Sequence, residues 1–107
     1  MNNFVDWREH AGSQPEKFFK STLWQGEHIT LGLNCLEPGQ IQKVHAHDGA
    51  DKVYYVLEGE GNFTIGDGQR HAATGMVIAA PAGIPHGVVN DGNQRLSLLV
   101  AISPPIK

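Results

Sequence analysis

Two histidines separated by a single residue, His45 and His47, have a spacing that could support chemistry. In an extended chain, residues i and i+2 point to the same face, so these two imidazoles would lie side by side. A third histidine, His86, follows in a second patterned stretch that contains Pro81 and Gly83. Neutral imidazole is a good ligand for Zn, Cu, Fe and Ni, and two from one strand plus one from another can cap one face of an ion. The three histidines are therefore candidate metal ligands.

These two stretches resemble the two sequence motifs of the cupin family. The first motif, G-x5-H-x-H-x3/4-E-x6-G, is matched at four positions, by Gly39, His45, His47 and Gly59. The second, G-x5-P-x-G-x2-H-x3-N, is matched throughout, by Gly75, Pro81, Gly83, His86 and Asn90. The resemblance implies an all-β fold, the double-stranded β-helix (jelly-roll) cupin barrel. It also implies that His45, His47 and His86 bind one divalent transition metal (Fe, Zn, Ni, Mn or Cu) in the barrel mouth.

The acidic ligand of the family motif is replaced by Lys52, in the register that Gly59 fixes. Asp51 is adjacent, but a shift of one residue along a strand turns a side chain to the opposite face. An ammonium that faces a dication is repelled, and burial also disfavours its charge. Three arrangements follow: Lys52 turns away to pair with an acid such as Glu60, it becomes a neutral amine that acts as a base, or its charge replaces the metal. We favour the first two together, which makes Lys52 a candidate catalytic residue.

Alternation along the predicted strands places further side chains in the mouth of the barrel. Tyr54 shares the face of Lys52, and its hydroxyl is a second candidate catalytic group. The alternative is a packed tyrosine whose O–H is satisfied. Ile41 and Lys43 share the face of His45, so we expect them to line the cavity wall.

Short strands joined by tight turns are expected throughout the chain. The 13 glycines and 6 prolines are typical of all-β proteins. We expect strands at 18–24, 28–36, 41–47, 52–57, 62–65, 69–73, 76–80, 86–89 and 95–102. Glu37–Gln40 predicts a type II turn, and Ala80–Gly83 predicts a type I turn.

Residues 1–16 lack a clear hydrophobic period, and residues 17–107 are expected to form a single cupin barrel domain. We expect the first segment to be an N-terminal arm that packs Phe4 or Trp7 on the wall of the barrel, the alternative being a partly ordered terminus. The apolar strand at 95–102 is expected to be buried on both faces. It is compatible with a homodimer, which many small cupins form.

Charge and composition narrow the classes of partner. The net charge is −3 and lysine and arginine do not cluster, which disfavours nucleic acid. No apolar run approaches the ~20 residues that span a bilayer, so no membrane partner is expected. The single cysteine, Cys35, cannot form an internal disulfide, and residues 1–20 carry charges where a signal peptide would be apolar. These features predict a cytoplasmic protein.

Three functions are consistent with the sequence. The first is a metal-dependent enzyme on a small organic substrate, similar either to the three-histidine cupin dioxygenases or to cupins that isomerise sugars and sugar acids. A neutral three-histidine set leaves the full +2 charge on the ion, so an anionic substrate can offset it. The second is a non-catalytic cupin that binds a small molecule. The third is a scaffold whose metal site is vestigial or absent.

Overall fold

The computed structural model describes residues 3–105, which form an all-β barrel with one short 3₁₀ helix, η1 (Trp7–His10). All of the expected strands are present, and their ends differ from the expected ones by no more than two residues. They are β1 (Phe19–Gln25), β2 (Thr30–Leu36), β3 (Ile41–His45), β4 (Asp51–Glu58), β5 (Glu60–Ile65), β6 (Gly68–Ala73), β7 (Val77–Ala80), β8 (His86–Val89) and β9 (Leu96–Ser103). The predicted all-β class is confirmed.

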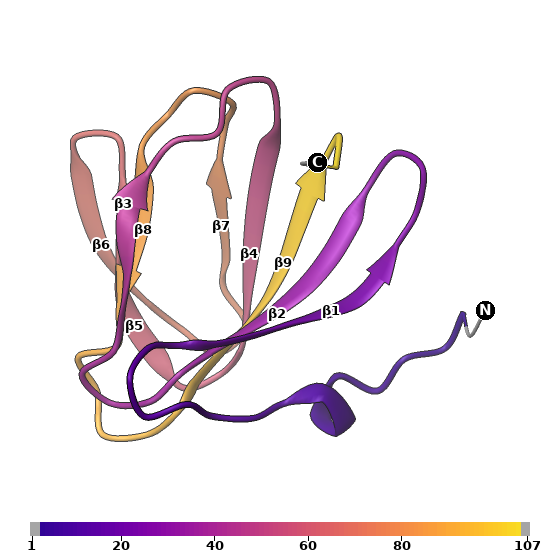
Figure 1. Ribbon diagram of the computed structural model, residues 1–107. Helices are drawn as coiled ribbons and strands as arrows, with labels where there is room; N and C mark the ends of the chain where they lie inside the picture. The colour runs from indigo at the N-terminus through magenta and orange to yellow at the C-terminus, as the bar shows by residue number, and fades with distance from the viewer. Residues whose placement is uncertain (1–2, 106–107) are drawn as a thin grey trace.

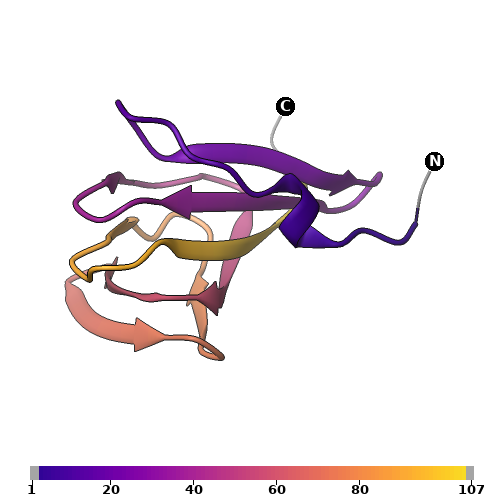
Figure 2. The same cartoon turned by 90° about the horizontal axis from the view of Figure 1, so that it is seen from below.

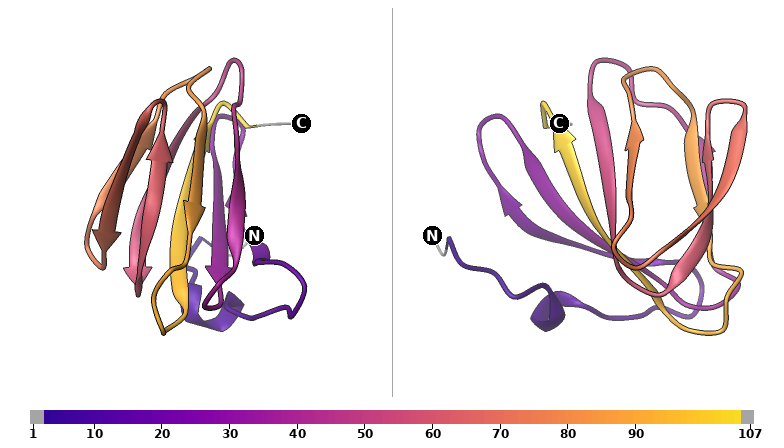
Figure 3. Two further views of the ribbon diagram at one scale, coloured as in Figure 1. Left: turned by 90° about the vertical axis from the view of Figure 1, so that its left-hand side faces the viewer. Right: turned by 180° about the vertical axis from the view of Figure 1, so that it is seen from behind.

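The strands form two antiparallel sheets that face each other. One sheet has the order β1-β2-β9-β4-β7, and the other has the order β3-β8-β5-β6. Sequence neighbours such as β3 and β4 therefore belong to opposite sheets, as in a jelly roll. The sheets converge at the lower end in Figure 1 and spread apart at the upper end, where the β1–β2 hairpin bends away (Figures 1 and 3). A cavity lined by residues of both sheets, including Gln42 of β3 and Lys52 of β4, lies between the sheets and forms the mouth of the barrel.

The apolar core fills the space between the two sheets. Alternate residues of β4 point inward, and the side chains of Tyr54 and Val56 are fully buried there. They pack with inward residues from the other strands: Leu36, Phe63, Ala72, Val88, Leu96, Leu98 and Val100. In β9, Leu96, Ser97 and Leu98 are buried in succession, which confirms burial on both faces for this first part of the strand. The core holds the sheets together, and the mouth is left to polar side chains.

Several motif residues stabilise turns and loops and are not part of the metal site. Gly39 has φ +88° and the Gln40 amide donates to the Glu37 carbonyl, which confirms the predicted type II turn. The side chain of Asn90 is fully buried, and its amide donates to the carbonyls of Leu36 (2.7 Å) and Gln94 (2.8 Å). At the closed end of the barrel, Asn90 therefore links the end of β2 to the loop between β8 and β9.

The second predicted turn was wrong by one residue. The Ile84 amide donates to the carbonyl of Pro81, so the turn runs from Pro81 to Ile84 and not from Ala80 to Gly83. Gly83 occupies the third position with φ +79°, which a type I turn does not contain. The Gly83 amide instead donates to the carbonyl of His47 at 3.0 Å, and so joins the two motif loops.

The segment before β1 lies along the outside of the barrel, beside β1, β2 and β9 (Figure 2). Trp7 borders an apolar groove with Leu23, Leu31 and Leu99 on the outer face of the five-stranded sheet. The Ser21 hydroxyl donates to the His10 carbonyl at 3.2 Å and ties the segment to β1. Trp7 thus lies on the wall as predicted, whereas Phe4 is 88% exposed. No helix among residues 3–105 has the length and apolar character that crossing a bilayer requires.

Candidate metal centre

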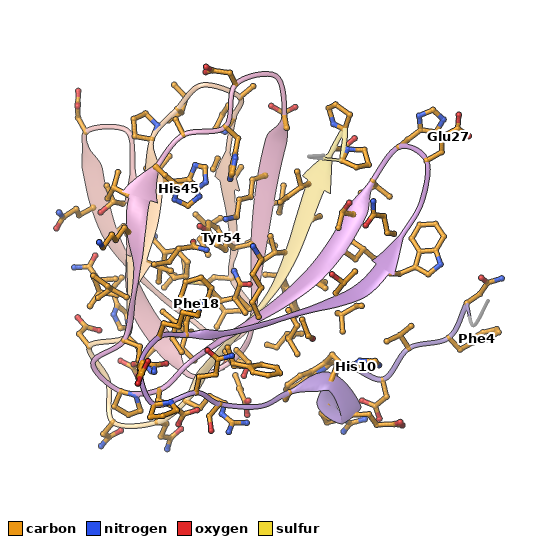
Figure 4. The ribbon with its side chains drawn as sticks, in the orientation of Figure 1. Phe4, His10, Phe18, Glu27, His45 and Tyr54 are labelled. Atoms are coloured by element: carbon orange, nitrogen blue, oxygen red, sulfur yellow. The ribbon has the colours of Figure 1, made fainter. Side chains whose placement is uncertain are left out.

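Three histidines converge in the mouth of the barrel. His45 is the last residue of β3, His47 follows two residues later, and His86 opens β8. The antiparallel pairing of β3 with β8 sets His45 directly opposite His86. One ring nitrogen from each histidine lies within 4.8 Å of the other two, and the Nε2 atoms of His45 and His47 are 3.1 Å apart. Figure 4 shows His45 above Tyr54 and pointing into the barrel.

Backbone carbonyls fix which ring nitrogens face the centre. The Nδ1 of His45 lies 2.7 Å from the carbonyl oxygen of Lys43, and the Nδ1 of His86 lies 3.1 Å from that of Ile84. A carbonyl oxygen only accepts, so each Nδ1 carries the hydrogen and each Nε2 of a neutral ring presents a lone pair. Metal-bound histidines commonly donate their other N–H to a carbonyl in this way. The arrangement therefore fits imidazole ligands that are oriented in advance.

His86 places an unsatisfied ring nitrogen at the centre. Its side chain is 1% exposed. Among the described residues, its Nε2 is a buried side-chain nitrogen without a hydrogen-bond partner. An unpaired buried acceptor costs about 1–3 kcal/mol, and a metal ion would satisfy it. The donor set fits a transition metal such as Zn, Cu, Fe or Ni.

Electrostatics favour the neutral, ligating form of these rings. Burial, followed by the charges of His45 and Lys52, lowers the pKa of His47. Burial is also the main cause of the lowered pKa of His86, which the hydrogen bond to Ile84 partly opposes. Because the ordinary histidine pKa is about 6.5, both rings are neutral at pH 7 and available to a metal.

The wall beside the histidines is formed by Gln42 and not by the residues that alternation predicted. Gln42 is buried and lines the cavity, whereas Ile41 is 47% exposed and Lys43 is also exposed. The prediction failed because the pairing of β3 with β8 shifts register between Gln42 and His45. Two successive residues, Lys43 and Val44, therefore face solvent. Such a β-bulge reverses the alternation, and nothing in the local residue pattern marks it.

Lys52 enters the cavity, although its partner differs from the predicted one. It is 3% exposed, its Nζ lies 3.5 Å from Oε1 of Gln42, and it stands 4.7 Å from the centroid of the Tyr54 ring. The predicted pairing with Glu60 was wrong, because Glu60 instead lies 3.2 Å from His71. Among the described residues no salt bridge includes Lys52. Burial, and to a lesser degree the charge of Lys20, lowers the pKa of Lys52 to about 8.

Tyr54 lies beneath Lys52, as their shared face of β4 requires. Its side chain is fully buried, and its hydroxyl donates to Oε1 of Gln42. Burial raises the pKa of Tyr54 well above its usual value. The hydroxyl is thus satisfied and protonated, and Tyr54 supports the wall of the cavity from below.

Other candidate ligands lie elsewhere. Asp51 accepts a hydrogen bond from the Ala82 amide at 2.9 Å, outside the histidine cluster. His10, His28 and His71, which belong to neither motif, are exposed. Within residues 3–105, the three motif histidines form the one group of three or more acidic, cysteine or histidine side chains that could hold a metal.

Two of the histidines, His45 and His47, border a cavity of about 320 Å³ in the barrel mouth, which is lined mostly by polar residues. His45, His47 and Gln42 lie on the side of β3, which belongs to the four-stranded sheet. The opposite side comes from the five-stranded sheet, chiefly from β1 and β2. It consists of Lys20, Ser21, Thr22, Gln25, Thr30, Gly32, Asn34, Lys52, Val100 and Ile102. The cavity is suited to a small, polar organic molecule.

Comparisons with known proteins agree with this geometry. A crystal structure of TT1209 from Thermus thermophilus is 44% identical, superposes with a TM-score of 0.92, and covers 96% of this chain and 98% of its own. Uncharacterized protein YrkC of Bacillus subtilis is 30% identical over an alignment of 93 residues that covers 81% of this chain and 50% of YrkC. The oxalate-binding protein of Thermotoga maritima is 34% identical over 67 residues, 63% of this chain and 55% of that protein. This chain thus spans about half the length of these two curated relatives.

The family pattern described as "Cupin domain" matches residues 32–102, which include both motifs and all three histidines. With the two-sheet barrel and the converging histidines, this match places the chain in the cupin family.

Proposed function

We propose that His45, His47 and His86 hold one divalent transition metal and that the protein is a metal-dependent cupin enzyme acting on a small organic substrate. The observation that carries the proposal is the buried, unpartnered Nε2 of His86, which faces the other two rings. The hydrogen bonds at Nδ1 of His45 and His86 support it, because they leave the Nε2 lone pairs for a ligand. Three protein ligands leave coordination positions open, as in catalytic sites generally.

A divalent ion bound there would supply Lewis-acid chemistry toward an oxygen atom of the bound molecule. The chain itself would supply a proton acceptor. Lys52 borders the same cavity, and its pKa of about 8 leaves part of the population as a neutral amine near neutral pH. Tyr54 is a positioning residue in this proposal, because its hydroxyl is occupied by Gln42 and orients that amide.

Elemental analysis of the protein, purified without a histidine tag or added metal, tests the metal site. We expect about one transition-metal ion per chain, and its loss in His86→Ala. His71→Ala is the matched control, because His71 is exposed and outside the cluster, and it should retain the metal. Absence of metal from the purified protein and on titration would rule the proposal out.

Two reaction classes are compatible with this site. Oxygen uptake after addition of Fe(II) and a β-diketone or a thiol would indicate a dioxygenase. Conversion of a sugar or sugar acid without oxygen consumption would indicate an isomerase. Lys52→Met tests the proton acceptor in either class, because it should lower kcat while metal content is retained.

A non-catalytic binding protein is the second candidate. It is favoured by the relative from Thermotoga maritima, whose name gives it as an oxalate-binding protein. Saturable binding of a small molecule to the metal-loaded protein, with no product after prolonged incubation, would support this candidate over an enzyme.

A further inference from the structure

The cavity in the barrel mouth has a charge opposite to that of the whole protein. The chain carries a net charge of −3. Two lysines, Lys20 and Lys52, nevertheless border the cavity, and of the described residues none with a carboxylate does so. Lys20 is close enough to Lys52 and His47 for its charge to lower the pKa of both. A cavity with walls of one charge concentrates the field and attracts the opposite ion.

The amide of Gln42 adds a fixed hydrogen-bond donor to this charge. Its Oε1 receives the Tyr54 hydroxyl and faces Nζ of Lys52, and a protonated amine can only donate. The orientation of the amide group follows from these two donors. Its NH₂ group is therefore on the other side, and among the described residues it has no hydrogen-bond partner. Gln42 borders the cavity, so this donor is available to a bound molecule.

We propose that Lys20, Lys52 and Gln42 form an anion subsite that holds the carboxylate group of a small organic acid. This inference rests on the proposed function in one respect, namely that ligands bind in the mouth cavity. The subsite itself does not require the metal. A carboxylate fits better than a phosphate, because no arginine of the described residues borders the cavity and no helix begins there. The cavity of about 320 Å³ has room for a small acid.

Calorimetric titration of metal-free protein with malonate at pH 7 and low salt tests the subsite. Malonamide has a similar shape without charge, and we expect it to bind at least about tenfold more weakly, since hydrogen bonds to charged groups are stronger than neutral ones. Equal binding of malonate and malonamide would overturn the proposal. Tighter binding of inorganic phosphate than of malonate would also overturn the assignment to a carboxylate.

Two variants connect the binding to the named residues. Lys20→Gln removes an exposed charge at the cavity, and we expect it to weaken malonate binding about two- to fivefold. Lys17→Gln removes the same charge outside the cavity and should change the affinity by less than the first variant. Gln42→Glu keeps the size of the side chain but adds a negative charge, and should weaken malonate at least about tenfold. Equal effects of the two lysine variants, or malonate binding unchanged by Gln42→Glu, would overturn the proposal.

Metal titration of the same samples separates this inference from the proposed function. Malonate binding that depends on Lys20 in a protein that binds no metal supports the subsite and refutes the metal centre. A protein that binds one metal ion per chain but no malonate, with or without the metal, refutes the subsite and leaves the metal centre standing.

Discussion

At the scale of single residues, Lys52 is the side chain that most distinguishes this site. It occupies the position of the acidic ligand in the family motif, and the structure keeps it inside the barrel at 3% exposure. A buried ammonium is tolerated when neighbours supply acceptors or when it loses its proton. Here both apply, since Gln42 offers an oxygen and the pKa falls to about 8. The neutral histidine set and this lysine together make a more cationic site than the motif predicts.

Substitution of Lys52 by glutamate should strengthen metal binding. Lys52 lowers the pKa of His47 and His86 through its charge, so it opposes a dication in the same place. Lys52→Glu removes that repulsion and adds a carboxylate ligand, and we expect affinity to rise at least about tenfold. Lys52→Met is the matched control, since it removes only the charge. Competition with a chromophoric chelator measures the metal affinity of both variants. Equal affinities would show that the side chain at position 52 does not reach the metal.

The buried lysine should also make stability depend on pH. Its pKa is about 8 in the folded protein against 10.5 for an ordinary lysine, so the unfolded chain binds more protons between these values. Stability therefore rises with pH through this window, and below pH 8 the cost of burying the charge is fully present. We expect metal-free Lys52→Met to be more stable than the parent by up to about 3 kcal/mol at pH 7. That advantage should shrink by about 2 kcal/mol at pH 9.5.

Urea unfolding at the two pH values measures this difference. Because Tyr54 is buried in both proteins and its raised pKa affects the stability of both, comparing the variant with the parent largely removes its contribution. An advantage of Lys52→Met that is the same at both pH values would contradict a lowered lysine pKa.

The metal-site residues were predictable where their positions follow from residues nearby in the sequence. His45 and His47 share a face because they are two residues apart, and the family motif added His86. Gln42 was missed because its orientation depends on the bulge at Lys43 and Val44, which arises from pairing with β8. A bulge depends on the partner strand, and a single sequence does not contain that information.

At the scale of elements, the glycine after β4 shows how tightly the closed end of the barrel is built. Gly59 has φ +82°, and a Cβ there would overlap the carbonyl oxygen of Arg95. Gly39 also has positive φ, but a Cβ there meets nothing within 4 Å. Gly39→Ala should therefore cost about 1 kcal/mol, from backbone strain alone, and Gly59→Ala should cost clearly more. Equal losses in denaturant unfolding would mean that the chain at Gly59 moves away without penalty.

Strand positions were predictable because turn-forming residues mark where each strand begins and ends. Glycine, proline and asparagine punctuate the chain at intervals that leave room only for short strands. The turn at Pro81 was predicted one residue too early. The residues Ala80-Pro81-Ala82-Gly83 fit a type I turn, but a turn over Pro81–Ile84, with glycine at its third position, fits the sequence equally well. The hydrogen bond from Gly83 to His47 decides between them, and it links two loops far apart in sequence.

At the scale of the whole molecule, the closed end of the barrel contributes most to stability, and the mouth carries the candidate functional groups. Apolar side chains from both sheets fill the closed end and the middle, whereas polar and titratable groups gather at the mouth where the sheets diverge (Figure 1). The family resemblance implied the type of barrel, and the order of strands in each sheet was not predicted from the sequence. Pairings such as β2 with β9 join residues 60 to 72 positions apart, and local patterns carry no information on them.

This division predicts that the protein folds without its metal. The three histidines lie outside the apolar cluster, and two of them are only half-buried, so removing an ion leaves the core intact. Chelator-treated protein should keep its far-ultraviolet circular dichroism and a cooperative thermal transition. Metal at one hundred times its dissociation constant should add about 2.7 kcal/mol of stability, equivalent to a rise in Tm of roughly 10 °C. His86→Ala should lose this rise, while His71→Ala should retain it. A metal-free chain that is unfolded would show that the histidine centre, and not the apolar core, closes this barrel.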